Sequence, residues 1–165
     1  MGTASSVQRE ERKIDMSDVD FVRCRVCGAT NRVPREDVAQ GLEPVCGRCK
    51  TPLSLKPVEV TDATFSTEVE RSPVPVLLDM WAAWCNPCRM IAPVVEQLGA
   101  EIGGRVRVAK MDVEKNPLTA SRFNVRSIPT LLILKNGREV DRIVGVQSKS
   151  EIVQRLRRVI ATRAA

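Results

Sequence analysis

The fold of this chain is decided by the stretch Asp79-Met80-Trp81-Ala82-Ala83-Trp84-Cys85-Asn86-Pro87-Cys88-Arg89. The residues just before it, Val74–Leu78, form a nearly unbroken apolar run with β-branched members, which is typical of a strand covered on both faces. After it, apolar residues recur at helical spacing and form one stripe: Ile91, Val94, Val95, Leu98 and Ile102. We therefore predict a buried strand, a turn, and a helix from about Cys85 to Ile102.

Two cysteines, Cys85 and Cys88, fall in the first turn of this predicted helix. Backbone N–H groups are unpaired there, and the positive end of the helix dipole favours an anion. A cysteine in such a position has a depressed pKa and is partly thiolate near neutrality. Pro87 is compatible with the first turn, because its missing N–H would have no helical partner. The two residues between the cysteines allow a tight disulfide or an open dithiol.

Asp79 is the only charged residue from Val74 to Cys85, and its neighbours in sequence are apolar. A buried aspartate has a raised pKa and could take the proton from the Cys88 thiol and return it. The chain has no histidine, so the usual base for cysteine chemistry is absent. This favours Asp79 as the base, with water or the partner thiol as alternatives. An aspartate at a strand edge in water would have no such role.

Four further cysteines follow the pattern C-x2-C-x18-C-x2-C, which fits a four-thiolate zinc site: Cys24, Cys27, Cys46 and Cys49. Gly28 and Gly47 suit the turns that such pairs require. A segment of about 35 residues without a large apolar cluster is too small to fold unaided, so a metal would supply stability. Four thiolates leave no position for a catalytic water, so we predict one structural zinc ion. Two structural disulfides or a second redox dithiol are the alternatives.

Composition limits the classes of function. The chain of 165 residues is 43% hydrophobic but only 3% aromatic, which predicts an aliphatic core. Its formal charge of +6 comes with 20 interspersed acids, and Phe21 is the only aromatic near the arginines of the cysteine-rich segment. We therefore expect a solvated surface and no nucleic-acid partner. Apolar runs are too short to cross a membrane, and no secretory signal is evident. We expect a cytoplasmic protein with reduced cysteines.

The chain divides into three predicted parts: a flexible tail 1–20, a four-cysteine zinc ribbon 21–56 and an α/β domain 57–165. Met16 is an alternative start. In the α/β domain, Thr61 or Asp62 should cap a helix that runs to about Arg71. The other predicted elements alternate between strand and helix: strands at Val58–Val60, Arg105–Met111, Leu131–Leu134 and Val140–Val144, and helices at Asn116–Arg122 and after Ser148 or Ser150. Asn136-Gly137 predicts a hairpin between the last two strands.

The segment Trp81–Cys88 resembles the active-site segment of the thioredoxin family, whose usual form is WCGPC. Asn86 takes the place of the usual glycine, which bears on the redox potential and the range of partners. Further motifs follow in the order of the family: Lys110-Met111-Asp112, Asn116-Pro117, Ile128-Pro129-Thr130, Lys135-Asn136-Gly137 and Val144-Gly145-Val146. The resemblance covers residues 57–165 and implies a mixed central sheet flanked by helices. With the ribbon in front, the arrangement resembles the zinc-carrying thioredoxins of bacteria.

The resemblance implies reduction of protein disulfides by thiol–disulfide exchange, with Cys85, Cys88 and Asp79 as catalytic residues. It also implies a cis-proline loop and an apolar surface that receive the substrate: Trp84, Asn86, Pro87, Ile128 and Pro129. A simple turn is the alternative for that loop. Lys110 would tune Asp79 by its charge, or would be an ordinary surface lysine. The implied partners are disulfide-containing proteins and a flavin-dependent thioredoxin reductase that uses NADPH, with no organic cofactor bound to this chain.

Two other functions are hypotheses from the sequence. The first is a zinc-dependent redox sensor or holdase, in which oxidation ejects zinc, unfolds the ribbon and exposes a binding surface. It follows from the dependence of the ribbon on its metal. The second is an oxidant or isomerase, because the residues between the two active-site cysteines tune the potential and Asn86 is unusual.

Overall fold

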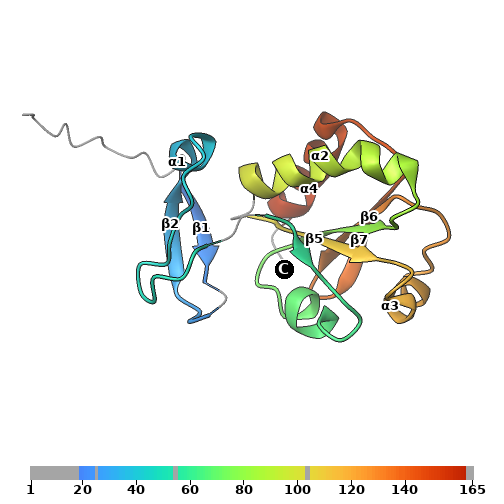
Figure 1. Ribbon diagram of the computed structural model, residues 1–165, viewed down its shortest axis with the longest axis horizontal. Helices are drawn as coiled ribbons and strands as arrows, with labels where there is room; N and C mark the ends of the chain where they lie inside the picture. The colour runs from blue at the N-terminus through green and yellow to red at the C-terminus, as the bar shows by residue number, and fades with distance from the viewer. Residues whose placement is uncertain (1–18, 25, 54–55, 103–104, 163–165) are drawn as a thin grey trace, which may run out of the picture.

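The computed structural model consists of a small two-stranded sheet beside a larger five-stranded one (Figure 1). It describes residues 19–24, 26–53, 56–102 and 105–162. In the small unit, β1 (Val19–Arg23) pairs antiparallel with β2 (Thr30–Pro34), and α1 (Arg35–Ala39) follows directly. β1 begins two residues before the predicted start of the ribbon, so Val19 and Asp20 belong to the ribbon. The rest of the predicted tail lies outside the described residues.

The five-stranded sheet has the order β3-β5-β4-β6-β7 and is mixed, as expected. β3 and β4 run parallel to β5, β6 runs antiparallel to β4, and β7 runs antiparallel to β6. The strands are β3 (Val58–Glu59), β4 (Val76–Trp81), β5 (Arg107–Asp112), β6 (Thr130–Lys135) and β7 (Arg138–Val144). Asn136 and Gly137 both have positive φ, the conformation that a tight two-residue hairpin requires.

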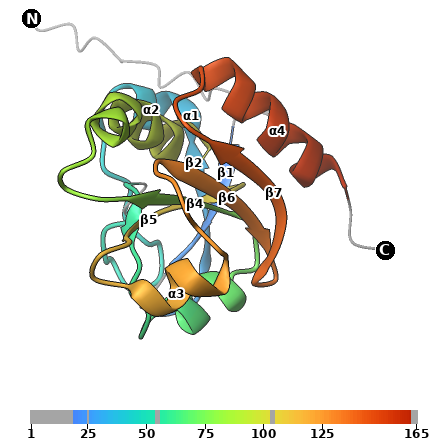
Figure 2. The same ribbon diagram turned by 90° about the vertical axis from the view of Figure 1, so that its right-hand side faces the viewer.

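Helices cover both faces of this sheet. Figure 2 shows α2 (Asn86–Ile102) and α4 (Lys149–Ala161) on one face and α3 (Pro117–Arg122) on the other. Two separate apolar cores fill the spaces between sheet and helices. Successive side chains of a strand point to opposite faces, and in β4 Leu77 packs on the α2 side whereas Leu78 packs on the other. This alternation turns Asp79 toward α2.

The predicted helix from Thr61 or Asp62 to Arg71 is wrong in length and type. The structure has only η2 (Ser66–Glu70), a single π-helical turn, although Phe65 and Val69 are buried as expected. The Thr61 hydroxyl accepts a hydrogen bond from Thr64 N–H, but the Asp62 carboxylate forms its hydrogen bonds with a different helix. It accepts hydrogen bonds from the N–H groups of Leu118 and Thr119 and so caps α3. The Asp62 carboxylate is therefore bound by Thr119, which lies 57 positions further along the chain, and not by the helix that follows it directly.

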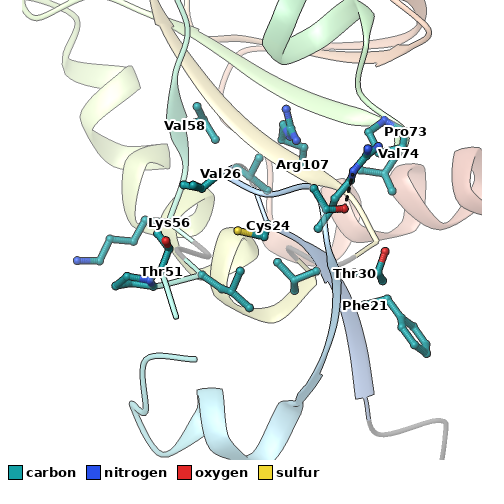
Figure 3. Close-up of a pocket in the computed structure, with 16 residues that line it drawn as sticks. Phe21, Cys24, Val26, Thr30, Thr51, Lys56, Val58, Pro73, Val74 and Arg107 are labelled. Carbon is teal, nitrogen blue, oxygen red and sulfur yellow. Dashed lines mark hydrogen bonds between the residues drawn. The ribbon is translucent and has the colours of Figure 1, made fainter. Parts of the chain in front are cut away.

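The ribbon has a small core of its own, and α1 within it was not predicted. Its buried members are Val22, Cys24, Val33, Cys46 and Leu53. The ribbon lies beside the C-terminal end of α2 (Figure 1), where the nearly buried Asp20 carboxylate forms ion pairs with Arg35 and with Arg105 of the larger unit. A cavity of about 620 Å³ separates the ribbon from β3 and β5; Figure 3 shows Cys24, Val58 and Arg107 among its lining residues. No described helix is long and apolar enough to cross a membrane.

Candidate active site and metal centre

The Cys85–Cys88 pair lies at the junction of β4 and α2, as predicted, and forms a disulfide. The two Cα atoms are 5.3 Å apart, and both residues are almost fully buried. Cys85 N–H donates to the carbonyl of Ala82, and this bond closes the turn after β4. The Cys88 N–H, at the start of the helix, donates to Cys85 Sγ at 3.2 Å. A donor aimed at this sulfur favours its anion when the disulfide opens.

Asp79 is buried, with 1% of its surface exposed, so a strand-edge aspartate in water is excluded. Among the described residues no group hydrogen-bonds to its Oδ1 atom. Burial raises the pKa of Asp79 to about 7, the charge of Lys110 opposes this rise, and Glu59 adds to it. A cavity of about 130 Å³ connects the carboxyl with the second cysteine, and its lining includes Asp79, Cys88, Arg89 and Lys110.

Lys110 lies where the resemblance predicts, beside Asp79 in the register of the parallel strands β4 and β5. Its Nζ atom is 3.7 Å from Glu96 Oε1 and 5.3 Å from the centre of the Trp81 ring. The side chain is only 20% exposed. Lys110 is therefore largely covered, and its charge lies near both Trp81 and Glu96.

Exposed residues lie beside the buried disulfide. Trp84 is 64% exposed, and Asn86 and Pro87 are exposed beside it. The Ile128–Pro129 bond is cis, as the resemblance implies, and Ile128 packs against the cluster that contains both cysteines. Gly145 N–H donates to the Pro129 carbonyl, which fixes the loop. The backbone N–H and C=O groups of Ile128 make no hydrogen bond within the described part of the chain.

The four N-terminal cysteines meet at one point of the ribbon. Their sulfur atoms all lie within 4.8 Å of one another, and the Cys24–Cys49 and Cys27–Cys46 separations are both 3.6 Å. Sulfurs bound at about 2.3 Å to a tetrahedral zinc ion are about 3.8 Å apart. The cluster therefore fits a four-thiolate metal site, and all four cysteines are free of disulfides.

Two carboxylates of the site were missed in the sequence. Trp84 Nε1 donates to Glu114 Oε1 at 2.7 Å, which anchors the exposed indole, and Glu96 pairs with Lys110. Glu114 is 30 residues from its partner, and charged residues at such positions look like ordinary surface residues in a sequence. The spacing of Cys88, Ala92 and Glu96 at intervals of four along α2 was the available signal for Glu96.

Comparison with known proteins decides the family. The family model for thioredoxin matches residues 56–158. The chain belongs to the thioredoxin family. It is 49% identical over 98 residues to thioredoxin 1 of Nostoc sp., a match that covers 59% of this chain and 92% of the relative. It is 48% identical over 103 residues to a thioredoxin of Mycobacterium tuberculosis, covering 62% of this chain and 89% of the relative.

A third relative extends the similarity toward the N-terminus. Thioredoxin C-3 of Corynebacterium nephridii is 45% identical over 135 residues, which cover 81% of this chain and 91% of the relative. This thioredoxin is accordingly a protein disulfide oxidoreductase with a redox-active Cys85–Cys88 pair. Four clustered cysteines that fit a zinc ribbon precede its thioredoxin domain.

Proposed function

We propose that Cys85 is the nucleophile with which this thioredoxin reduces disulfides of other proteins. The hydrogen bond from Cys88 N–H to Cys85 Sγ carries this assignment, because it stabilises negative charge on that sulfur. The Cys85 thiolate attacks one sulfur of the substrate disulfide, breaks the S–S bond and releases one substrate thiolate. The product is a mixed disulfide between Cys85 and the substrate.

Cys88 completes the reaction. Its thiol gives up a proton and attacks Cys85 Sγ, so the second substrate thiol leaves and the Cys85–Cys88 disulfide forms. The two sulfurs thereby supply both electrons. Asp79 is the proposed proton acceptor, since a pKa of about 7 suits a base near neutrality. The cavity of about 130 Å³ between Asp79 and Cys88 is large enough for a bridging water.

The substrate is proposed to lie across the apolar surface beside the dithiol. Its main chain would pair with the free backbone groups of Ile128, and its side chains would contact Trp84, Asn86, Pro87 and Pro129. The N–H and C=O groups of Ile128 support this, because they have no hydrogen-bond partner in the described part of the chain and lie on a half-buried residue beside the two cysteines. A flavin-dependent reductase using NADPH is the proposed source of electrons, and the cytoplasm the proposed compartment.

One zinc ion is the proposed occupant of the ribbon. Cys24, Cys27, Cys46 and Cys49 would hold it as thiolates, and it would cross-link the two ends of the ribbon. The sulfur separations of 3.6 Å support this assignment. A closed site of this kind has a structural role. The ribbon is proposed to span residues 21–56 with the addition of Val19 and Asp20.

The proposed roles are tested by insulin reduction coupled to NADPH oxidation through a thioredoxin reductase. Wild type should turn over, and Cys85→Ser should not. Cys88→Ser should keep the first step and accumulate a mixed disulfide with the substrate, visible on a non-reducing gel and lost with dithiothreitol. If Cys88→Ser traps nothing while Cys85→Ser traps substrate, the order of attack is reversed. An inactive wild type with zinc bound would favour the sensor hypothesis.

A further inference from the structure

The ammonium group of Lys110 has two contacts that fix its position. It lies over the Trp81 ring at 5.3 Å and pairs with Glu96 Oε1 at 3.7 Å. Lys110 is also the register partner of Asp79, yet these two form no ion pair in the described ranges. The lysine next to the proton acceptor is thus paired with a different carboxylate.

We infer that Glu96 is a positioning residue of thiol–disulfide exchange. It holds the Lys110 ammonium at Trp81 and thereby determines how near this positive charge lies to Asp79 when Asp79 accepts the proton of Cys88. This inference rests on the proposed role of Asp79. Glu96 does not border the small cavity between Asp79 and Cys88, so it acts through Lys110.

The helix gives Glu96 a defined place. Cys88, Ala92 and Glu96 follow at intervals of four in α2, so they share one face of the helix. Cys88 and Ala92 line the cavity with Asp79 and Lys110, and Glu96 continues that row toward the ribbon. There it borders a second cavity, which it shares with Leu42 and Leu53 of the ribbon. The carboxylate therefore stands between the ribbon and the dithiol.

The charges around Asp79 determine the direction of the effect. They come from three elements, namely Lys110 on β5, Glu59 on β3 and Arg89 on α2, whereas the Cys88 sulfur is uncharged in the disulfide. Loss of the Glu96 charge removes a negative group and frees Lys110 to approach Asp79. Both changes favour the Asp79 anion, so the carboxyl should ionise at lower pH. Loss of the Lys110 charge should have the opposite effect.

The test follows the Asp79 side-chain carboxyl carbon by NMR as a function of pH, in the zinc-loaded full chain with the Cys85–Cys88 disulfide closed. Glu96→Gln should shift the titration midpoint to lower pH by about 0.5 pH unit, the size expected for a partly exposed ion pair. Lys110→Met should shift it to higher pH. In the Lys110→Met background, Glu96→Gln should lose at least half of its effect.

A matched control is Glu101→Gln, because Glu101 is a half-exposed carboxylate on the same helix that pairs with Lys149. It should leave the Asp79 midpoint unchanged. An unchanged midpoint in Glu96→Gln, or an undiminished shift in the Lys110→Met background, overturns the inference. Because the disulfide form does not turn over, this titration stands apart from the reductase assay. If wild type fails to reduce insulin but Glu96→Gln still shifts the Asp79 midpoint, the proposed function is wrong and the charge coupling among Glu96, Lys110 and Asp79 stands.

Discussion

Asp79 is the residue whose proposed function conflicts with stability. Its carboxyl is buried beneath α2, its Oδ1 atom has no hydrogen-bond partner among the described residues, and its pKa is raised to about 7. A buried carboxyl oxygen without a hydrogen-bond partner is unfavourable for the stability of the fold. Its position beside the cavity that reaches Cys88 fits the proposed role as proton acceptor.

This conflict predicts a pH-dependent gain of stability in Asp79→Asn. In the unfolded chain the carboxyl titrates near 3.8, and in the folded chain near 7. Between these values the folded state binds more protons, so wild-type stability falls as the pH rises and levels off above pH 7. Asp79→Asn should therefore raise the free energy of unfolding at pH 8 by up to about 4 kcal/mol.

Guanidinium denaturation of the disulfide form at pH 4 and at pH 8 measures this difference. At pH 4 the Asp79 carboxyl is protonated in the folded chain and only about half ionised in the unfolded chain, so the stability of the variant should lie close to that of wild type. The same variant should reduce insulin more slowly near pH 7. An equal gain of stability at both pH values would mean that packing, and not charge, explains the effect.

The elements of the site are joined by side chains that reach from one element to another. Asp62, which precedes η2, caps α3 with hydrogen bonds of 2.8 Å from Thr119 N–H and 2.6 Å from Thr119 Oγ1. The Asn116 side chain accepts from Asp62 N–H and donates to the carbonyl of Asp112 at the end of β5. These bonds hold α3 against the sheet, ahead of the loop that contains Pro129.

Removal of this cap gives a prediction at the scale of the element. Burial alone would raise the pKa of Asp62, but the donors from Thr119 and Leu118 outweigh burial and hold the pKa below its usual value. Asp62→Ala should lower the free energy of unfolding by about 1–2 kcal/mol at pH 7. The depressed pKa means that these hydrogen bonds stabilise the ionised carboxylate. The difference in unfolding free energy between wild type and Asp62→Ala should therefore shrink as the pH falls below 3.8 and the carboxylate is protonated.

Urea denaturation at pH 7 and pH 3 provides the measurement. Asp62→Asn serves as the matched variant, since its amide oxygen still accepts one hydrogen bond and should retain part of the stability. A loss in Asp62→Ala that is as large at pH 3 as at pH 7 would contradict the role of the carboxylate charge.

The whole molecule has two units with different sources of stability. The thioredoxin domain has two large apolar cores, one on each face of its sheet. The core of the ribbon is much smaller, and two of its five buried members are cysteines of the metal cluster. The units meet at the C-terminal end of α2, whereas the dithiol lies at the N-terminal end (Figure 1).

Metal removal should therefore affect the two units differently. A strong chelator should release one zinc ion per chain, and backbone amides of β1 and β2 should then lose protection from hydrogen exchange. Amides of β4 and β6 should stay protected, and insulin reduction should continue. Exchange measured by mass spectrometry before and after chelation, with re-addition of zinc as the control, tests this. Loss of protection in β4 would show that the domain depends on the ribbon.

Local patterns in the sequence determined much of this protein. The apolar run before Asp79, the helical stripe after Cys88 and the Asn136-Gly137 turn each specify structure through near neighbours. The spacing of the four N-terminal cysteines likewise brings them to one point. The positions of Cys85, Cys88 and the cis proline were predicted correctly for this reason or by resemblance.

Only the tertiary structure decided how charged side chains are paired. Asp62 caps a helix 57 residues away, Trp84 is anchored by a carboxylate 30 residues away, and Lys110 pairs with Glu96 and not with its register partner Asp79. Each pairing depends on how helices and loops pack around the sheet, because charges interact through space and over several ångströms. A sequence shows which charges are present, but the fold determines which of them meet.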